Sequence, residues 1–276
     1  METVDEEVEE EEDEEGHGDV NAYAAAFKNR KVGIASFSCI LATIFLLFNE
    51  PIISDHLIEI GISENYIGPI FAASCLSYAI AAPLVGYLVT RFSKEALTLF
   101  AFTMSSIALL AFGPSKLLGL GPNITLTVGG FIFLGSMEAF IFVPLMPILI
   151  EALTEAELSL AKSSKDSDEE SGKTPAPVSV PDEEAMSDQA SSIFQGAQAV
   201  GCIAGPIIGG YLNDLVKFQS TCDFMAVTCA LYAVLLYLTM GPSAKASITK
   251  DAAKALGSLE LGPRKKNEPS AALKQA

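Results

Sequence analysis

Long apolar stretches that lack Lys and Arg constrain this chain more than any other feature of its sequence. An α-helix needs about 20 mainly apolar residues to cross the roughly 30 Å hydrocarbon core of a bilayer. We expect helices because the alternation typical of strands is absent and lipid offers no partner for unpaired backbone groups. The sequence therefore predicts an all-α membrane protein with six transmembrane helices, at about 32–53, 66–89, 96–113, 124–150, 192–212 and 222–241.

The distribution of Lys and Arg predicts which side of the membrane each connecting segment faces. Short loops that stay in the cytoplasm carry an excess of these residues. With six spans, 15 of the 17 basic residues fall on one side, and only Lys116 and Lys217 fall on the other. Both termini are therefore expected in the cytoplasm, and the membrane is expected to be that of a vesicle, another endomembrane or the plasma membrane.

Acidic residues are concentrated outside the apolar stretches, so the net charge of −17 describes the tails and one loop. The first 19 residues hold twelve acids and no Lys or Arg, and such a segment buries too little apolar surface to fold alone. A second polar segment, SSKDSDEESGKTPAPVSVPDEE, is rich in Ser, Pro and acids and reads as disordered. The predicted order is an acidic disordered cytoplasmic arm (1–30), transmembrane helices one to four (31–153), a disordered cytoplasmic loop (154–189), helices five and six (190–242) and a cytoplasmic tail (243–276).

Enzyme and metal chemistry find little support in the sequence. The five cysteines lie mostly in apolar runs without metal-ligand spacing, which is typical of small buried hydrophobic residues. No G-x4-G-K-[ST] phosphate loop is present, and His56 is expected to be exposed on the non-cytoplasmic side and isolated. We therefore expect no enzyme activity, no metal, no cofactor and no nucleic-acid partner; the lipid bilayer is the first expected partner.

Glycines cluster unusually in the fifth stretch, GCIAGPIIGG, at residues 201–210. Gly201, Gly205 and Gly209 recur every four residues, so they form a groove along one helix face that allows close packing on a neighbouring helix. Pro206 leaves a carbonyl one turn back without its usual hydrogen-bond partner and favours a bend. Gly210 has no side chain and leaves the adjacent helix surface flat. The groove predicts either a flexible contact or a static packing seam.

Several motifs together resemble the C-terminal half of major facilitator superfamily carriers. The pattern G-x3-G-P-x2-G-G at 201–210 is similar to a motif associated there with proton-linked antiporters. The segment ending in GYLVTRFSK resembles the G-x3-D-R-x-G-R/K loop motif, kept as Gly86, Arg91 and Lys94, with Thr90 in place of the acid and Ser93 in place of the second glycine. FNEPIISDHL, AFGPSKLLGL and IFVPLMPILIEAL look like the matching segments of the vesicular amine and polyamine transporter branch, in the same order.

The resemblance implies one six-helix bundle of a two-bundle fold and a secondary active transporter. It implies proton-coupled antiport of a small organic cation, an amine or a polyamine. By alignment, Gln195 occupies the place of an acid of the monoamine members, and Glu138 lies one residue from another, which favours a polyamine or other organic cation. A single bundle implies a partner, either a second six-helix bundle or a second copy of the chain in a homodimer.

Acids inside apolar stretches are the first candidates for binding the proton or the substrate. A charged group in the hydrocarbon is costly, so it is a functional hypothesis by default. Glu138 lies near the middle of its stretch, in GSMEAFIF, and Glu50 precedes Pro51 late in the first stretch. Glu151 is expected to be a gate or boundary residue. The polar residues expected to line the path are Gln195, Gln198, Ser77 and Tyr78.

Three explanations for a half-length carrier remain open. The chain is a fragment of a twelve-helix carrier, a half-size carrier that dimerises, or a non-transporting scaffold or regulator whose acidic segments bind partners. The acidic arm followed by Lys28, Arg30 and Lys31 looks like a central cytoplasmic loop that leads into a seventh span, which favours the fragment.

Overall fold

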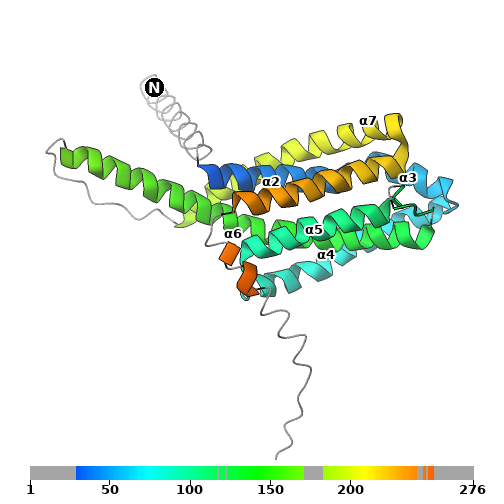
Figure 1. Cartoon of the computed structure of the whole chain (residues 1–276), viewed down its shortest axis with the longest axis horizontal. Helices are drawn as coiled ribbons and strands as arrows, with labels where there is room; N and C mark the ends of the chain where they lie inside the picture. The colour runs from blue at the N-terminus through cyan, green and yellow to red at the C-terminus, as the bar shows by residue number, and fades with distance from the viewer. Residues whose placement is uncertain are drawn as a thin grey trace, which may run out of the picture.

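The computed structural model describes residues 29–116, 118–121, 123–170, 183–240, 245–246 and 248–251, and all of its regular elements in these ranges are helical. The elements are α2 (Arg30–Leu47), α3 (Glu50–Glu59), the 3-10 turn η1 (Glu64–Tyr66), α4 (Ile67–Val89), α5 (Lys94–Phe112), α6 (Ile124–Glu170) and α7 (Glu183–Thr239). The long helices run along a common axis and form an elongated bundle (Figure 1). The acidic arm that we predicted for the first 30 residues lies almost wholly outside the described residues.

Proline and asparagine interrupt the first predicted span. α2 ends at Leu47, and α3 begins at Glu50 with Pro51 in its first turn, where the missing proline N–H leaves no hydrogen bond unmade. Between them, the Asn49 side chain donates a 2.7 Å hydrogen bond to the Leu46 carbonyl, so the break is satisfied locally. The two helices together form a candidate span, Arg30–Glu59.

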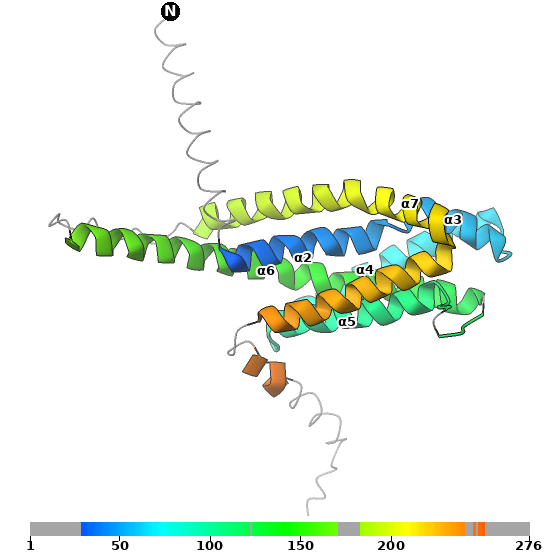
Figure 2. The same cartoon turned by 45° about the horizontal axis from the view of Figure 1, so that its top comes forward.

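The last two predicted spans lie within one element, α7. Its backbone leaves the helical region at Lys217, with φ 70° and ψ 161°, and this residue divides α7 into two limbs. The first limb, up to Lys217, runs to one end of the bundle, and the second limb returns along it, drawn in orange in Figures 1 and 2. The reversal of direction comes from this backbone turn, because the one proline of α7, Pro206, lies eleven residues earlier, within the first limb.

Five helices in the described residues are long and apolar enough to cross a membrane, against the six spans that we predicted. The fifth of them, Met186–Thr239, is 54 residues long and contains the turn at Lys217. The structure thus agrees with an all-α membrane protein, while the division into six spans stays a prediction that depends on counting the two limbs of α7 separately.

The segment that we predicted as a disordered loop, 154–189, is largely helical instead. α6 continues to Glu170, and α7 begins at Glu183, so only 171–182 lie outside the described residues. The physical reason is that 155–170 contain no Gly or Pro and several strong helix formers, Ala, Leu, Glu and Lys. The charged and polar residues indicate that the segment is solvated, but their helix propensity determines the backbone conformation as far as Glu170.

The core forms where α5, α6, α2 and the second limb of α7 meet. Phe102 and Phe112 of α5 are fully buried, and the Phe112 ring packs on Phe131 of α6 and on Phe218 of α7, with centroids 5.3 Å and 5.1 Å away. α4 packs mainly on α6 and presents large apolar side chains such as Ile80 and Leu84 outward. Such faces suit contact with lipid tails, which are as apolar as the side chains.

The bundle has two chemically different ends, which we name by their residues. α2 and α5 begin, and α7 ends, at the basic end, which carries Lys31, Arg91 and Lys94 (Figure 1). The opposite end carries α3, the α5–α6 connection and the turn of α7 at Lys217.

Candidate functional site

Glu138 is the most deeply buried of the acids that we predicted as site residues. It lies on α6, fourteen positions after the helix begins at Ile124, and only 7% of its surface is exposed. It makes no ion pair and no hydrogen bond with any described residue. A buried carboxyl without a cation is costly in its ionised form, so this position favours either a bound proton or a cationic ligand.

The neighbouring face of α4 is polar where it packs on α6 near Glu138. The Ser77 hydroxyl donates a 2.7 Å hydrogen bond to the Ile132 carbonyl, and the Ser74 hydroxyl donates a 3.2 Å bond to the Phe131 carbonyl. Gly135 allows this approach, because a Cβ there would lie 2.5 Å from the Ser74 hydroxyl oxygen. The Tyr78 side chain is half-buried and packs against a small apolar cluster that includes Ala139, the residue that follows Glu138. The structure therefore places Ser77 and Tyr78 of α4 against the stretch of α6 that carries Glu138.

The other polar candidates lie apart from this group. Gln195 is exposed and Gln198 half-buried on the first limb of α7, which contacts α6 through Phe194 and Phe142, with ring centroids 6.2 Å apart. Neither glutamine makes a hydrogen bond with Glu138. Glu50 is exposed at the first position of α3.

The glycines of the first limb of α7 face α2. A Cβ at Gly209 would lie 1.8 Å from the Phe48 carbonyl oxygen, and one at Gly201 would lie 2.5 Å from the Thr43 Cβ. At Gly205 the nearest atom, the Leu47 Cβ, would be 3.2 Å away. Gly210 has no neighbour within 4 Å, and Pro206 is half-buried inside the helix. The helix backbones thus approach closely along one glycine face.

The residues of the loop motif lie at the basic end. Gly86 of α4 is exposed with no neighbour within 4 Å, and the Arg91 guanidinium lies 5.2 Å from the centroid of the Tyr87 ring. Lys94, the first residue of α5, forms an ion pair with Glu151 of α6. This pair ties the start of α5 to α6, and it places Glu151 at the boundary of the bundle.

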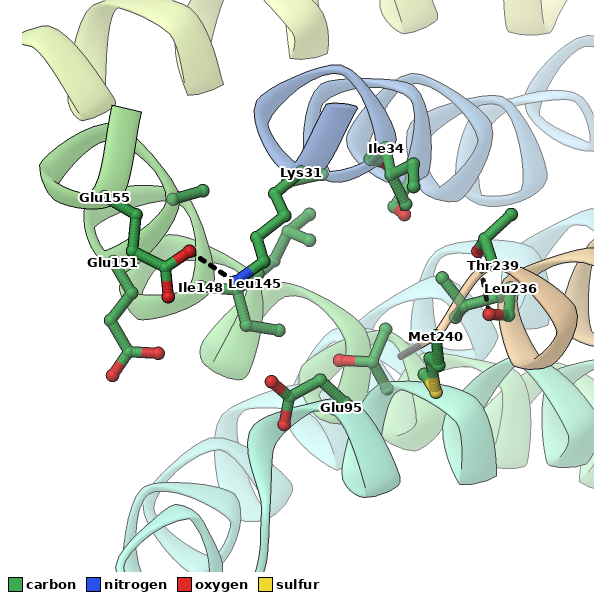
Figure 3. Close-up of a pocket in the computed structure, with 14 residues that line it drawn as sticks. Lys31, Ile34, Glu95, Leu145, Ile148, Glu151, Glu155, Leu236, Thr239 and Met240 are labelled. Atoms are coloured by element: carbon green, nitrogen blue, oxygen red, sulfur yellow. Dashed lines mark hydrogen bonds and ion pairs between the residues drawn. The ribbon is translucent and has the colours of Figure 1, made fainter. Parts of the chain in front are cut away.

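A cavity of about 460 Å³ opens at the basic end between α2, α5, α6 and the end of α7. Its polar rim consists of Lys31, Glu95, Glu151 and Glu155, and its apolar wall includes Ile148 and Leu236. Lys31 reaches from α2 to form an ion pair with Glu155, and Glu95 approaches from α5 (Figure 3). We did not predict Glu95 or Glu155 as site residues, although the i, i+4 spacing of Glu151 and Glu155 already placed two acids on one helix face.

The sequence analysis also missed the burial of two polar residues at the opposite end. Asp223 on the second limb of α7 is 6% exposed; its Oδ2 accepts a 3.2 Å hydrogen bond from the Lys116 backbone N–H, while its Oδ1 has no partner among the described residues. His56, which we expected to be exposed, is 8% exposed and stacks on Phe218 with a centroid distance of 3.8 Å. The prediction for His56 was wrong because the turn of α7 covers α3.

The described residues contain no group of three or more His, Cys, Asp or Glu side chains positioned to hold a metal ion. The three cysteines Cys39, Cys222 and Cys229 are buried, whereas Cys75 and Cys202 are exposed on helix surfaces, so burial of the cysteines was correct for three of five.

No family model matches the chain. Three similar proteins carry the name MFS-type transporter SLC18B1. The Mus musculus protein is 24% identical over 192 residues, 68% of this chain and 37% of the relative. The Rattus norvegicus protein is 22% identical over 211 residues, 75% of this chain and 42% of the relative, and the Homo sapiens protein is 23% identical over 214 residues, 76% of this chain and 41% of the relative. The chain therefore spans about two fifths of the length of these curated relatives, and the comparisons confirm its resemblance to the transporters of the major facilitator superfamily.

Proposed function

We propose that the chain is one bundle of a secondary active transporter that exchanges protons for a small organic cation, an amine or polyamine. The single observation that carries this proposal is Glu138, a carboxyl buried between α6 and α4 without a partner cation among the described residues. The names of the similar proteins support a transporter, and the apolar helices support a membrane protein.

One carboxyl of this kind supplies a simple means of exchange. When it holds a proton it is neutral, and low-dielectric surroundings favour that form. When it is ionised it needs a positive partner, and an ammonium group of a substrate provides one. Proton and cation then compete for the same oxygen atoms. The hydroxyls of Tyr78 and Ser77 on α4 supply hydrogen-bonding groups beside the carboxyl, and Gln195 and Gln198 are proposed to extend the polar path from α7.

Transport requires a second bundle in this proposal. Carriers of this architecture bind substrate near the midplane between two halves that rock against each other. The partner is either a second six-helix bundle or a second copy of this chain. The start of α2 and the end of α7 are both proposed to face the cytoplasm, because both lie at the basic end, which carries Lys31, Arg91 and Lys94.

Glu138→Gln tests the proposal directly. The substitution preserves size and removes the titratable group, so we expect loss of amine uptake by proteoliposomes with an acidic interior, about 100-fold or more as is typical for a proton-transfer group. The matched control is Glu64→Gln, which removes an exposed acid at the start of the turn η1 and should leave uptake unchanged. The chain is reconstituted alone and together with a separately supplied N-terminal bundle. Absence of uptake of any amine in both preparations would contradict the proposal.

The rival function is a non-transporting scaffold or regulator. It predicts that Glu138→Gln changes nothing, whereas deletion of the 154–189 segment abolishes the binding of a partner protein. The same pair of variants therefore separates the two functions.

A further inference from the structure

The residue just before α5, Ser93, is bonded by a carboxylate that lies much later in the chain. Asp251 lies 158 positions after Ser93, and its Oδ2 accepts two hydrogen bonds from that residue, one from the backbone N–H and one from the hydroxyl, each 2.9 Å long. Both residues are partly buried in this contact. The segment that we predicted as a cytoplasmic tail thus makes a defined, two-point contact with the helical bundle at Asp251.

This contact differs from the usual cap of a helix, because Asp251 bonds the N-cap residue itself. Ser93 is the N-cap residue of α5 and has the extended backbone of a cap, with φ −66° and ψ 139°, but its side chain accepts no hydrogen bond from its own helix. A serine in this position ordinarily accepts a bond from one of the first N–H groups of the helix. Here the hydroxyl donates to Asp251, and the carboxylate provides the negative charge that the positive end of a helix dipole favours.

The tail is also held at its other end. The Lys245 ammonium lies 5.1 Å from the centroid of the Tyr237 ring on α7, and the Thr249 hydroxyl donates a 3.0 Å bond to the Lys245 carbonyl within one helical turn. The described tail residues thus reach from the end of α7 to the start of α5, beside the basic end of the bundle (Figure 1). Thr239 of α7 and Glu95 of α5, which flank these two anchor points, both line the 460 Å³ cavity.

We propose that the start of α5, centred on Ser93, is a docking site for the chain's own C-terminal tail, with Asp251 as the docking group. The docked tail joins the end of α7 to the start of α5 at the rim of the cavity. An equilibrium between docked and undocked tails then changes the packing of these two helices at the basic end. This inference does not depend on transport.

The rate at which a cysteine in the tail reacts measures the docking. The parent variant for this experiment is the full chain with Ile248→Cys and with the exposed Cys75 and Cys202 replaced by serine. Position 248 is a half-buried position in the tail. Adding Asp251→Ala should raise the rate of reaction with a water-soluble maleimide about fivefold, the ratio that corresponds to loss of a typical helix cap. Ser93→Ala should give a smaller increase because the backbone N–H remains. The double variant should react no faster than Asp251→Ala, since both changes remove one contact.

Two further measurements distinguish docking from a general loosening of the tail. Lys250→Ala, one residue from Asp251, is the matched control and should leave the rate unchanged. High salt should accelerate the reaction of the parent chain and leave that of Asp251→Ala unchanged, because salt screens only the charged contact. In a chain that carries both Ser93→Cys and Asp251→Cys, a short bifunctional maleimide should join the two introduced thiols. The proposal is overturned if Asp251→Ala behaves like Lys250→Ala and the two introduced thiols are not joined.

Discussion

Buried polar side chains in this bundle differ in whether a second helix satisfies them. Ser38 of α2 and Tyr232 on the second limb of α7 are both buried, and their hydroxyl oxygens lie 2.6 Å apart. Asp223 has one carboxylate oxygen that accepts a hydrogen bond and one without a partner among the described residues. Neither carboxylate oxygen of Glu138 has a hydrogen-bond partner among those residues. A hydrogen-bonded pair holds two helices together, whereas a buried acid without a partner is free to bind a proton or a cation.

Removing the satisfied pair should weaken the bundle by a small, measurable amount. Tyr232→Phe keeps the ring, which packs on Phe102 at 5.0 Å, and deletes only the hydroxyl. We expect a loss of about 0.6 to 1.5 kcal/mol in the free energy of unfolding, the range for hydrogen bonds between membrane helices and in proteins generally. Denaturant titration of the purified chain in detergent measures it. Tyr237→Phe, on the same limb but 44% exposed, is the control, and an equal loss in both variants would contradict the assignment.

Sequence analysis singles out a residue only where that residue differs from its surroundings. Glu138 could be found because it is an acid within a long apolar run. The pair Ser38 and Tyr232 could not, because 194 positions separate the two residues and neither is unusual in its own helix. Asp223 escaped because it lies at the edge of a predicted span, where an acid needs no explanation until the fold shows it to be buried.

At the scale of helices, the glycine face of α7 makes the sharpest prediction. Gly209→Ala places a Cβ 1.8 Å from the Phe48 carbonyl oxygen, so α7 must move away from α2. Forcing extra atoms into a packed contact typically costs about 1 to 3 kcal/mol. Gly210→Ala meets nothing within 4 Å and should be neutral or stabilising by up to about 1 kcal/mol, because alanine favours helix over glycine.

Thermal unfolding of the two purified variants, measured side by side, checks this pair. The substitutions are chemically identical and adjacent in sequence, so only their direction around the helix separates them. Equal midpoints for Gly209→Ala and Gly210→Ala would show that α2 does not pack on this face.

The positions of helices could be predicted where an apolar stretch is long enough to cross the bilayer and polar residues mark both of its ends. α4 and α5 begin and end within a few residues of the predicted stretches, because polar residues bound both runs. The extension of α6 to Glu170 was missed because charge and polarity describe solvation rather than backbone shape. The docking of Asp251 on Ser93 was equally hidden: the loop motif has a glycine at that position, and a glycine has no side-chain donor for the second bond to Asp251.

At the scale of the whole molecule, the fold separates two kinds of surface. The outward faces of α4 and of both limbs of α7 are apolar, with exposed side chains such as Leu84, Ile207 and Leu231. The charged groups gather at the two ends instead, where the ion pairs Lys31–Glu155 and Lys94–Glu151 lie at the basic end. This separation is what a bundle embedded in a bilayer requires, since charges in the hydrocarbon are costly.

The orientation of the bundle in the membrane is the last testable consequence. The basic end should face the cytoplasm because Lys and Arg near the ends of spans are retained there. Thr90→Cys is exposed at this end and Glu64→Cys at the opposite end, and each is introduced with Cys75 and Cys202 replaced by serine. In sealed cells that carry the chain in the plasma membrane, an impermeant maleimide should label the Glu64→Cys variant directly and the Thr90→Cys variant only after permeabilisation. The pair controls for general reactivity because both positions lie in connections outside the long helices. Labelling of both variants from the same side would contradict a membrane-spanning α4, because the two positions lie at opposite ends of that helix. Labelling of the Thr90→Cys variant alone in sealed cells would show that the basic end faces the outside.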